Sequence, residues 1–160
     1  MTPGLKIVFS SILLSLSFIS TQAFAMTDMK GNPANVSSFI GKGQWLIVEA
    51  WHSECRTCKK TMPELVKSNG SFPNAKLIGV SLDGNKSKAQ RFINRFKVNF
   101  PTLLTDREEF NEYVRKIAKK SLLGAPTYLI FSPQGKLKAM QAGNITPADI
   151  KKYIRSQQKH

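Results

Sequence analysis

The sequence predicts a single α/β domain built on a central mixed sheet with helices on both faces. Short apolar runs typical of buried strands recur along the chain, at 45–50, 76–81 and 127–131. Segments whose apolar residues repeat with helical spacing lie between or after these runs. A βαβ unit followed by a hairpin and a helix gives a mixed sheet covered on both sides, and 160 residues suffice for one such core.

Residues 1–25 have the pattern of a secretory signal peptide. Lys6 is basic, residues 7–19 are apolar and serine-rich, and Ala23-Phe24-Ala25 matches an A-x-A cleavage site. We therefore expect a signal peptide at 1–25 and a folded, periplasmic domain at 26–160. The alternative is an uncleaved anchor that holds the domain to the inner membrane, facing the periplasm. The apolar run is short for a span, which needs about 20 residues.

The remaining chain predicts the order β-α-β-α-α-β-β-α. Residues 26–44 are polar and irregular, with a turn at 29–33 and a short helical turn at 36–40. The expected elements are a strand at 45–50, a helix at 55–69, a strand at 76–81, a helix at 86–98, an extended segment at 100–104, a helix at 108–119, a strand at 127–131, a hairpin turn at 132–135, an edge strand at 136–141 and a helix from 147.

Cys55-Arg56-Thr57-Cys58 lies between the first strand and the first helix. Two thiols three positions apart at a helix N-terminus are close enough to form a disulfide, and the helix dipole stabilises a thiolate there. Such a pair exchanges disulfides with other proteins and needs no cofactor beyond itself. Cys55, at the start of the helix, is expected to attack, and the more buried Cys58 to resolve the mixed disulfide.

Two other interpretations of the cysteine pair are weaker. Zinc usually has four ligands, and the chain adds only His52 and His160, so no metal site is expected. A small exported domain stapled by disulfides normally carries more cysteines, spread further apart.

Glu49 interrupts an otherwise apolar strand six residues before Cys55. We expect its carboxyl to be buried beneath the active-site helix, where desolvation raises its pKa. Such a group suits proton exchange with Cys58 as the disulfide opens and closes. The alternative is a glutamate at a strand end that reaches solvent or a nearby lysine.

The chain carries a net charge of +14. Its basic residues are scattered over the polar faces of the predicted helices, which favours ordinary solvated surfaces. The alternative is a functional surface for acidic partners, or for peripheral contact with an anionic membrane. No nucleic-acid-binding motif is present, so nucleic acid is not an expected partner.

Four segments in order carry a resemblance to a known family. They are the strand–Trp51–x–x–x–Cys–x–x–Cys–helix segment with Pro63 inside its helix, residues 78–83, residues 92–104, and Gly124-Ala125-Pro126-Thr127 with the strand and turn that follow. Together they resemble the thioredoxin superfamily and, within it, the exported TlpA-like branch of thiol–disulfide oxidoreductases. The resemblance covers roughly residues 29–154.

The resemblance implies a thioredoxin-like fold and roles for particular residues. Pro126 would be a catalytic-site cis-proline, Ala125 would offer backbone groups to an extended substrate, and the family's buried acid maps onto Glu49. The expected substrate-binding residues are Trp51, Glu54, Arg56, Ala125 and Thr127. This chain departs from the family in two places. Glu54 stands where an aromatic residue is usual, and Arg56-Thr57 separates the cysteines in place of Gly-Pro or a similar pair.

The function expected is thiol–disulfide exchange with protein cysteines, as a reductant or in an isomerase-like role. A reductant outside the cytoplasm would need a membrane redox partner. A disulfide-donating oxidase is the main alternative. A thiol peroxidase is disfavoured because the related peroxidases place Thr and Pro before the reactive cysteine, and residues 51–54 supply neither. A non-catalytic binding module is disfavoured because both cysteines are present.

Overall fold

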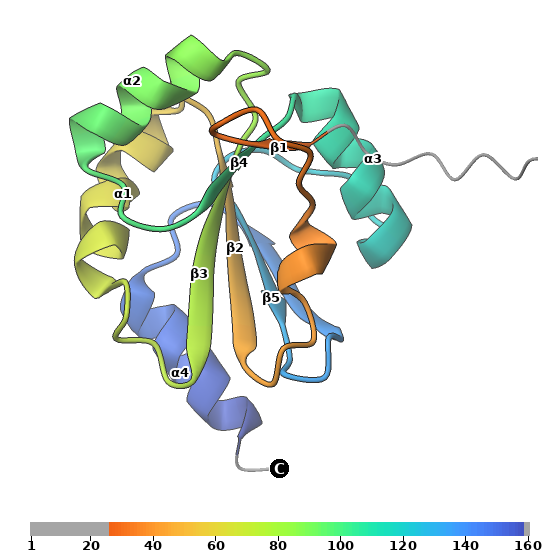
Figure 1. The fold of residues 1–160 in the computed structure, drawn as a ribbon. Coiled ribbons are helices and arrows are strands. Elements are labelled where there is room, and N and C mark those ends of the chain that lie inside the picture. The colour runs from red at the N-terminus through yellow and green to blue at the C-terminus, as the bar shows by residue number, and fades with distance from the viewer. Residues whose placement is uncertain (1–25, 159–160) are drawn as a thin grey trace, which may run out of the picture.

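The structure, a computed structural model, describes residues 26–158, so the expected signal peptide at 1–25 lies outside the described residues. A six-stranded sheet in the order β1-β4-β3-β2-β5-β6 forms its centre (Figure 1). The strands are β1 (Thr27–Asp28), β2 (Trp45–Trp51), β3 (Ala75–Ser81), β4 (Thr102–Leu104), β5 (Thr127–Phe131) and β6 (Leu137–Ala142). The helices are η1 (Val36–Phe39), α1 (Arg56–Ser68), α2 (Lys86–Phe96), α3 (Arg107–Ala118) and α4 (Pro147–Gln157).

Helices cover both faces of this sheet, as predicted. On one face α1, α2 and α4 bury residues such as Met62, Phe92 and Ile154, and on the other η1 and α3 bury Val36 and Phe110 (Figure 1). Each helix buries the apolar side that its helical spacing predicts. The sheet is mixed because β2, β3 and β4 run parallel, whereas β5 is antiparallel to β2.

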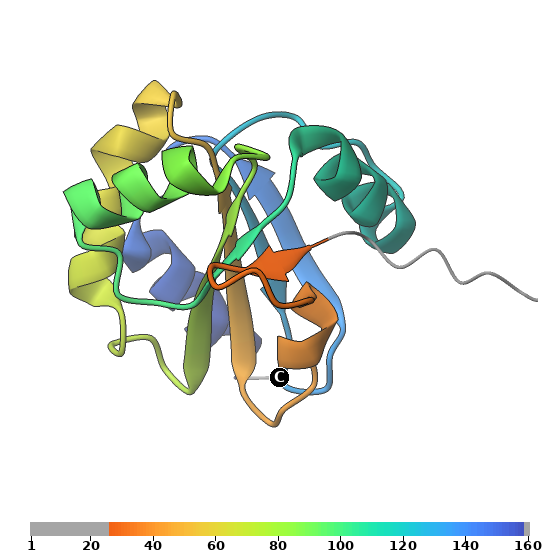
Figure 2. The same ribbon diagram turned by 45° about the horizontal axis from the view of Figure 1, so that its top comes forward.

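The N-terminal part of the sheet differs from the prediction. Two short strands, β1 and β4, lie side by side (Figure 2). They pair antiparallel, with Thr27 opposite Leu104. From the sequence, residues 26–44 were expected to be irregular and 100–104 only extended. A strand of two residues has no alternation to detect, and its partner lies far away in the chain. The predicted turn at 29–33 is present, and the Asp28 carboxylate accepts the backbone N–H groups of Lys30 and Asn32.

Helix ends also differ by one or two residues from the prediction. The first helix begins at Arg56, because Cys55 is its N-cap. The second ends at Phe96, because Lys97 has a left-handed backbone, with φ of 55°. Glycine usually occupies that position, so a lysine there gave no sequence signal.

The topology brings three chain segments to one edge of the sheet. Because β2 and β3 are parallel, their carboxyl ends meet, with Trp51 opposite Ser81. The start of β5 lies at the same edge, with Thr127 opposite Ala50. The loop that follows β2 and the loop that precedes β5 are therefore neighbours, although about 70 residues separate them, as for Cys55 and Ala125.

Candidate active site

Cys55 and Cys58 are paired as a disulfide at the N-terminus of α1. Cys55 is the N-cap, and its sulfur accepts the backbone N–H of Cys58 at 3.0 Å. The exposed fraction is 6% for Cys55 and zero for Cys58. Cys55 therefore presents the sulfur that a partner reaches first, and Cys58 lies beneath it, in the arrangement that the spacing predicts.

The start of α1 is positively charged. Its first turn contains no acidic residue, whereas Arg56 is exposed at the rim and Lys59 follows one turn later. The helix dipole and these cations favour a thiolate at Cys55. Glu54, also exposed, lies 3.8 Å from Lys59 and offsets part of that charge.

Asp83 fixes the loop that leads to Cys55. Its carboxylate accepts the Ser53 backbone N–H at 3.0 Å and the Ser53 hydroxyl at 2.7 Å, and Ser81 donates a further bond at 2.8 Å. Asp83 is not among the site residues that the sequence predicts. Its position just after the second strand was a usable signal, since the carboxyl ends of parallel strands meet at one edge of the sheet.

The loop before β5 lies against the cysteine pair. The Ala125–Pro126 peptide bond is cis, as the family resemblance predicts. The Cys55 sulfur is 3.3 Å from the carbonyl oxygen of Ala125. Thr127 is buried, and its hydroxyl donates to the carbonyl of Gly124 at 2.6 Å.

Glu49 lies in the middle of β2 with no exposed surface. Tyr128, directly opposite on β5, donates its hydroxyl to Glu49 Oε1 at 3.2 Å. Burial raises the pKa of Glu49 from 4.5 to about 8, and the hydrogen bond from Tyr128 opposes that rise. Within residues 26–158, Oε2 has no hydrogen-bond partner. The predicted burial is confirmed, and the alternative of a glutamate that reaches solvent or a lysine is wrong.

Tyr128 connects Glu49 to the active-site helix. Its hydroxyl also interacts with the side chain of Thr61, and burial together with the charge of Glu49 raises the pKa of Tyr128. The Thr61 hydroxyl lies 3.1 Å from the carbonyl of Thr57 and 3.4 Å from that of Cys58. Neither Tyr128 nor Thr61 was predicted as a site residue, because only the register between β2 and β5 places Tyr128 opposite Glu49.

Trp51 supports the site from below. It is fully buried and stacks on Phe92 of α2, with 4.3 Å between ring centroids. Of the five residues expected to bind substrate, Trp51 and Thr127 have buried side chains, whereas Glu54 and Arg56 are exposed and Ala125 is half-buried. The structure thus gathers the predicted site residues around the carboxyl end of β2, with Glu49 two residues inside that strand.

Residues 26–158 contain no group of three or more His, Cys, Asp or Glu side chains placed to hold a metal ion.

Among the helices between residues 26 and 158, none combines the length and the apolar character needed to cross a membrane.

Comparisons with known proteins agree with this geometry. A sequence profile of the AhpC/TSA family matches residues 20–140. The chain is 25% identical to thiol-disulfide oxidoreductase ResA of Geobacillus kaustophilus over 139 residues, which covers 83% of this chain and 73% of ResA. It is 27% identical to ResA of Bacillus subtilis over 134 residues, with 82% and 70% covered.

Solved structures show the same fold. The thioredoxin domain of a thiol-disulfide oxidoreductase from Bacteroides vulgatus superposes with a TM-score of 0.66 at 22% identity, covering 84% of this chain and 95% of that one. StoA from Bacillus subtilis superposes with a TM-score of 0.62 at 24% identity, covering 82% and 95%. The predicted thioredoxin-like fold is confirmed.

Proposed function

The chain belongs to the AhpC/TSA family, and we propose that this member is an exported enzyme that reduces or isomerises disulfides of other proteins. It is a thiol–disulfide oxidoreductase: relatives across most of its length carry that name, and its own Cys55 and Cys58 form a disulfide at a helix N-terminus. The observation that carries the proposal is this pair, in which Cys55 keeps a small exposed surface and Cys58 none, together with the buried carboxyl of Glu49 on the preceding strand.

In the proposed reaction, the Cys55 thiolate attacks one sulfur of a substrate disulfide. The substrate S–S bond breaks, and the departing sulfur leaves with the electron pair and takes a proton from water. Cys58 gives up its proton and attacks Cys55, which closes the enzyme disulfide. The second substrate sulfur leaves as a thiolate, so the substrate gains two electrons and the enzyme loses two.

Glu49 is proposed to accept and return the Cys58 proton. Its carboxyl is neutral over most of the physiological range when the cysteines are oxidised, because burial raises its pKa to about 8. A protonated Glu49 in the disulfide form matches the step in which Cys58 has just lost its proton. Tyr128 and Thr61 position the carboxyl relative to α1.

Ala125 and Pro126 are proposed to guide the substrate chain. The Ala125 carbonyl lies within 3.3 Å of Cys55, so an extended segment carrying the target sulfur would run along this loop. Glu54 and Arg56 at the exposed rim would contact residues on either side of that sulfur.

The proposed direction is reduction, and it requires a source of electrons. Outside the cytoplasm we propose a membrane protein dithiol, which gives two electrons to the Cys55–Cys58 disulfide and becomes a disulfide itself. Residues 1–25 are proposed to be a cleaved signal peptide that delivers the domain 26–160 to the periplasm, with an uncleaved anchor as the alternative. The basic surface would favour contact with an anionic membrane.

The reduction potential of the Cys55–Cys58 pair, measured against glutathione, tests the direction. A potential of about −270 mV or lower, as in thioredoxin, supports a reductant, whereas about −120 mV, as in strong periplasmic oxidants, makes the protein a disulfide donor. Insulin reduction by the wild type and by Cys55→Ser tests the chemistry itself. Equal activity of the two proteins would contradict the proposed role of Cys55.

A further inference from the structure

A cleft with basic walls lies beside the cysteine pair. It has a volume of about 420 Å³ and is lined by Ser53, Glu54 and Lys59, near the start of α1, and by side chains within residues 88–96 of α2. We call it the basic cleft. Glu54 precedes Cys55 directly in the chain, so one wall of the cleft continues into the reactive disulfide.

The charges of the basic cleft are unbalanced. Lys88, Arg91 and Arg95 of α2 and Lys59 of α1 supply four cations, and Glu54 is the one acidic residue in the lining. The three α2 cations are exposed and fall at i, i+3 and i+7, so they share one side of the helix. Within residues 26–158, Lys59 pairs with Glu54, and Arg115 pairs with Glu112 on α3.

The lining of the basic cleft includes two aromatic rings, those of Phe92 and Phe96. Phe92 is buried, stacks on Trp51 and lies 4.5 Å from the ring of Phe96, centroid to centroid. The Arg95 guanidinium lies over the Phe96 ring at 5.6 Å. Phe92 therefore joins the lining of the cleft to Trp51, which supports the active site.

Other carboxylates near the cleft do not neutralise it. Glu54 is exposed and 3.8 Å from Lys59, so the two largely offset each other. Asp83 accepts hydrogen bonds from Ser53 and Ser81, which are neutral donors, so its carboxylate adds a second negative charge beside the cleft. Four cations thus stand against the carboxylates of Glu54 and Asp83, so the cleft keeps a net positive charge that attracts an anion from outside the chain.

We propose that the basic cleft binds acidic side chains that flank the target cysteine of a substrate protein. This inference rests on the proposed function, because it assigns a substrate preference to the same site. Each residue of an extended chain spans about 3.3–3.6 Å, so a carboxylate within a few positions of a sulfur bound to Cys55 reaches the cleft. Carboxylates pair well with guanidinium groups, and a basic cleft beside a reactive group accelerates encounter with acidic partners.

A matched pair of disulfide peptides tests this substrate preference. One peptide carries three Asp residues next to the reactive cysteine, and the other carries three Asn residues at the same positions. The second-order rate constant for reduction by the pre-reduced protein is measured for each, in about 0.01 M and about 1 M salt. We expect the acidic peptide to react about tenfold faster in low salt and the advantage to disappear in high salt.

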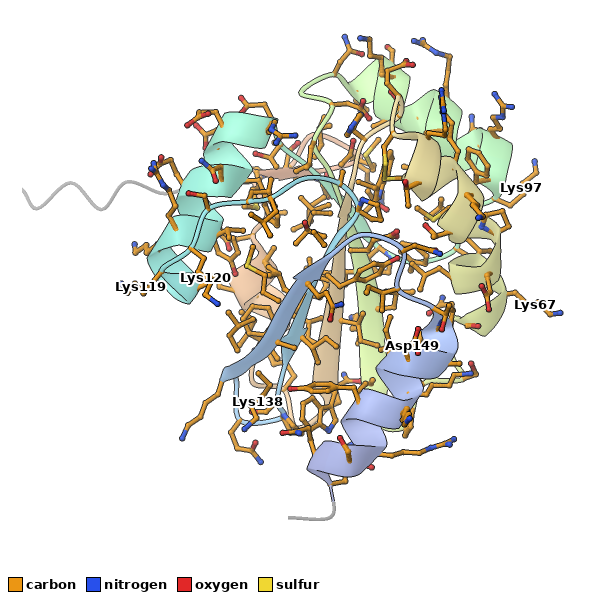
Figure 3. All side chains as sticks on the ribbon, turned by 180° about the vertical axis from the view of Figure 1, so that it is seen from behind. Lys67, Lys97, Lys119, Lys120, Lys138 and Asp149 are labelled. Atoms are coloured by element: carbon orange, nitrogen blue, oxygen red, sulfur yellow. A yellow bond between two sulfur atoms is a disulfide. The ribbon has the colours of Figure 1, made fainter. Side chains whose placement is uncertain are left out.

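Two triple variants locate the preference on the molecule. Lys88→Gln, Arg91→Gln, Arg95→Gln removes three charges from the basic cleft, and Lys120→Gln, Lys136→Gln, Lys138→Gln removes the same charge elsewhere. Lys120 and Lys138 lie on the opposite side of the molecule from Lys97 at the end of α2 (Figure 3). We expect the first variant to reduce the acidic and the neutral peptide at similar rates and the second to keep the faster reaction with the acidic peptide. Circular dichroism confirms that both are folded.

The outcomes distinguish failure of the proposed reductant function from failure of the basic cleft proposal. If the wild type reduces neither peptide, the proposed reductant function fails. If it reduces both at equal rates in low salt, or if both variants lose the preference equally, only the basic cleft proposal is overturned. Binding to phosphatidylglycerol vesicles that is lost in the cleft variant, with peptide rates unchanged, would assign the cleft to a membrane and also overturn it.

Discussion

Replacing Glu49 by glutamine should remove the part of the pH dependence of stability that the Glu49 carboxyl contributes. Glutamine keeps the size of the side chain and an oxygen that accepts from Tyr128, but it does not titrate. In the wild type the pKa of Glu49 rises from 4.5 in the unfolded chain to about 8 in the folded protein, because the carboxyl is completely buried. The folded state therefore binds the proton more tightly than the unfolded state between these two values.

The sign and size of the effect follow from linkage. Where the folded state holds more protons, stability falls as pH rises. At 1.36 kcal/mol per pKa unit, the free energy of unfolding of the wild type should fall by about 4 kcal/mol between pH values of about 4.5 and 8, relative to Glu49→Gln. The destabilisation is complete above the folded pKa and absent well below the unfolded one.

Urea unfolding of both oxidised proteins at a series of pH values measures this difference. Subtracting the two curves cancels the groups that titrate alike in both proteins and leaves the contribution of Glu49. The same pair in an insulin reduction assay should show slower turnover for Glu49→Gln and a changed pH profile. A flat stability difference would show that Glu49 does not retain its proton in the fold, and an unchanged pH profile of turnover would remove its role in proton transfer.

Two further substitutions test the groups around Glu49. Tyr128→Phe removes the hydrogen bond that lowers the pKa of Glu49. In the same unfolding series, the pH at which stability levels off should therefore rise by about one unit. If that pH did not change, the assigned hydrogen bond would be contradicted. Gly79→Ala should cost about 1–3 kcal/mol in urea unfolding, because its new methyl group would lie 2.9 Å from the Trp51 indole nitrogen. Gly124→Ala, with nothing within 4 Å, is the matched control and should cost clearly less.

The parts of the site that are local in sequence could be predicted from the sequence. The strand–loop–helix around Cys55 and Cys58 needs only an apolar run, a turn and helical spacing to recognise. Glu49 was identifiable as a buried acid, because the apolar residues on both sides of it place that part of the strand in the core.

The parts that depend on register could not be predicted in the same way. Tyr128 meets Glu49 because β5 pairs with β2 in one particular alignment, and a shift of one residue would turn its side chain to the other face. The basic cleft depends on α2 packing against α1, whereas the sequence shows only helices with many cations. For the same reason, solvated helix faces were the favoured interpretation of the charge from the sequence.

The distribution of charge along the helices indicates that the charge of the basic cleft is not simply a result of the basic composition of the chain. In the same strongly basic chain, α3 has Glu108 and Glu109 in its first turn and Arg115 and Lys116 in its last, which is the pattern that stabilises a helix dipole. Helix α4 likewise has Asp149 in its first turn.

Among the α-helices of residues 26–158, those without an acid in the first turn are α1 and α2, and these two border the basic cleft. Cations at a helix N-terminus oppose the dipole and cost some helix stability. At α1, Arg56 and Lys59 favour a thiolate on Cys55. At α2, Lys88 in the first turn lines the basic cleft, whereas Arg95 lies in the last turn, where a cation suits the dipole. Local choices that disfavour the helix but suit the chemistry are expected at functional sites. The absence of a first-turn acid in α1 and α2, and its presence in α3 and α4, supports one continuous surface for catalysis and substrate selection.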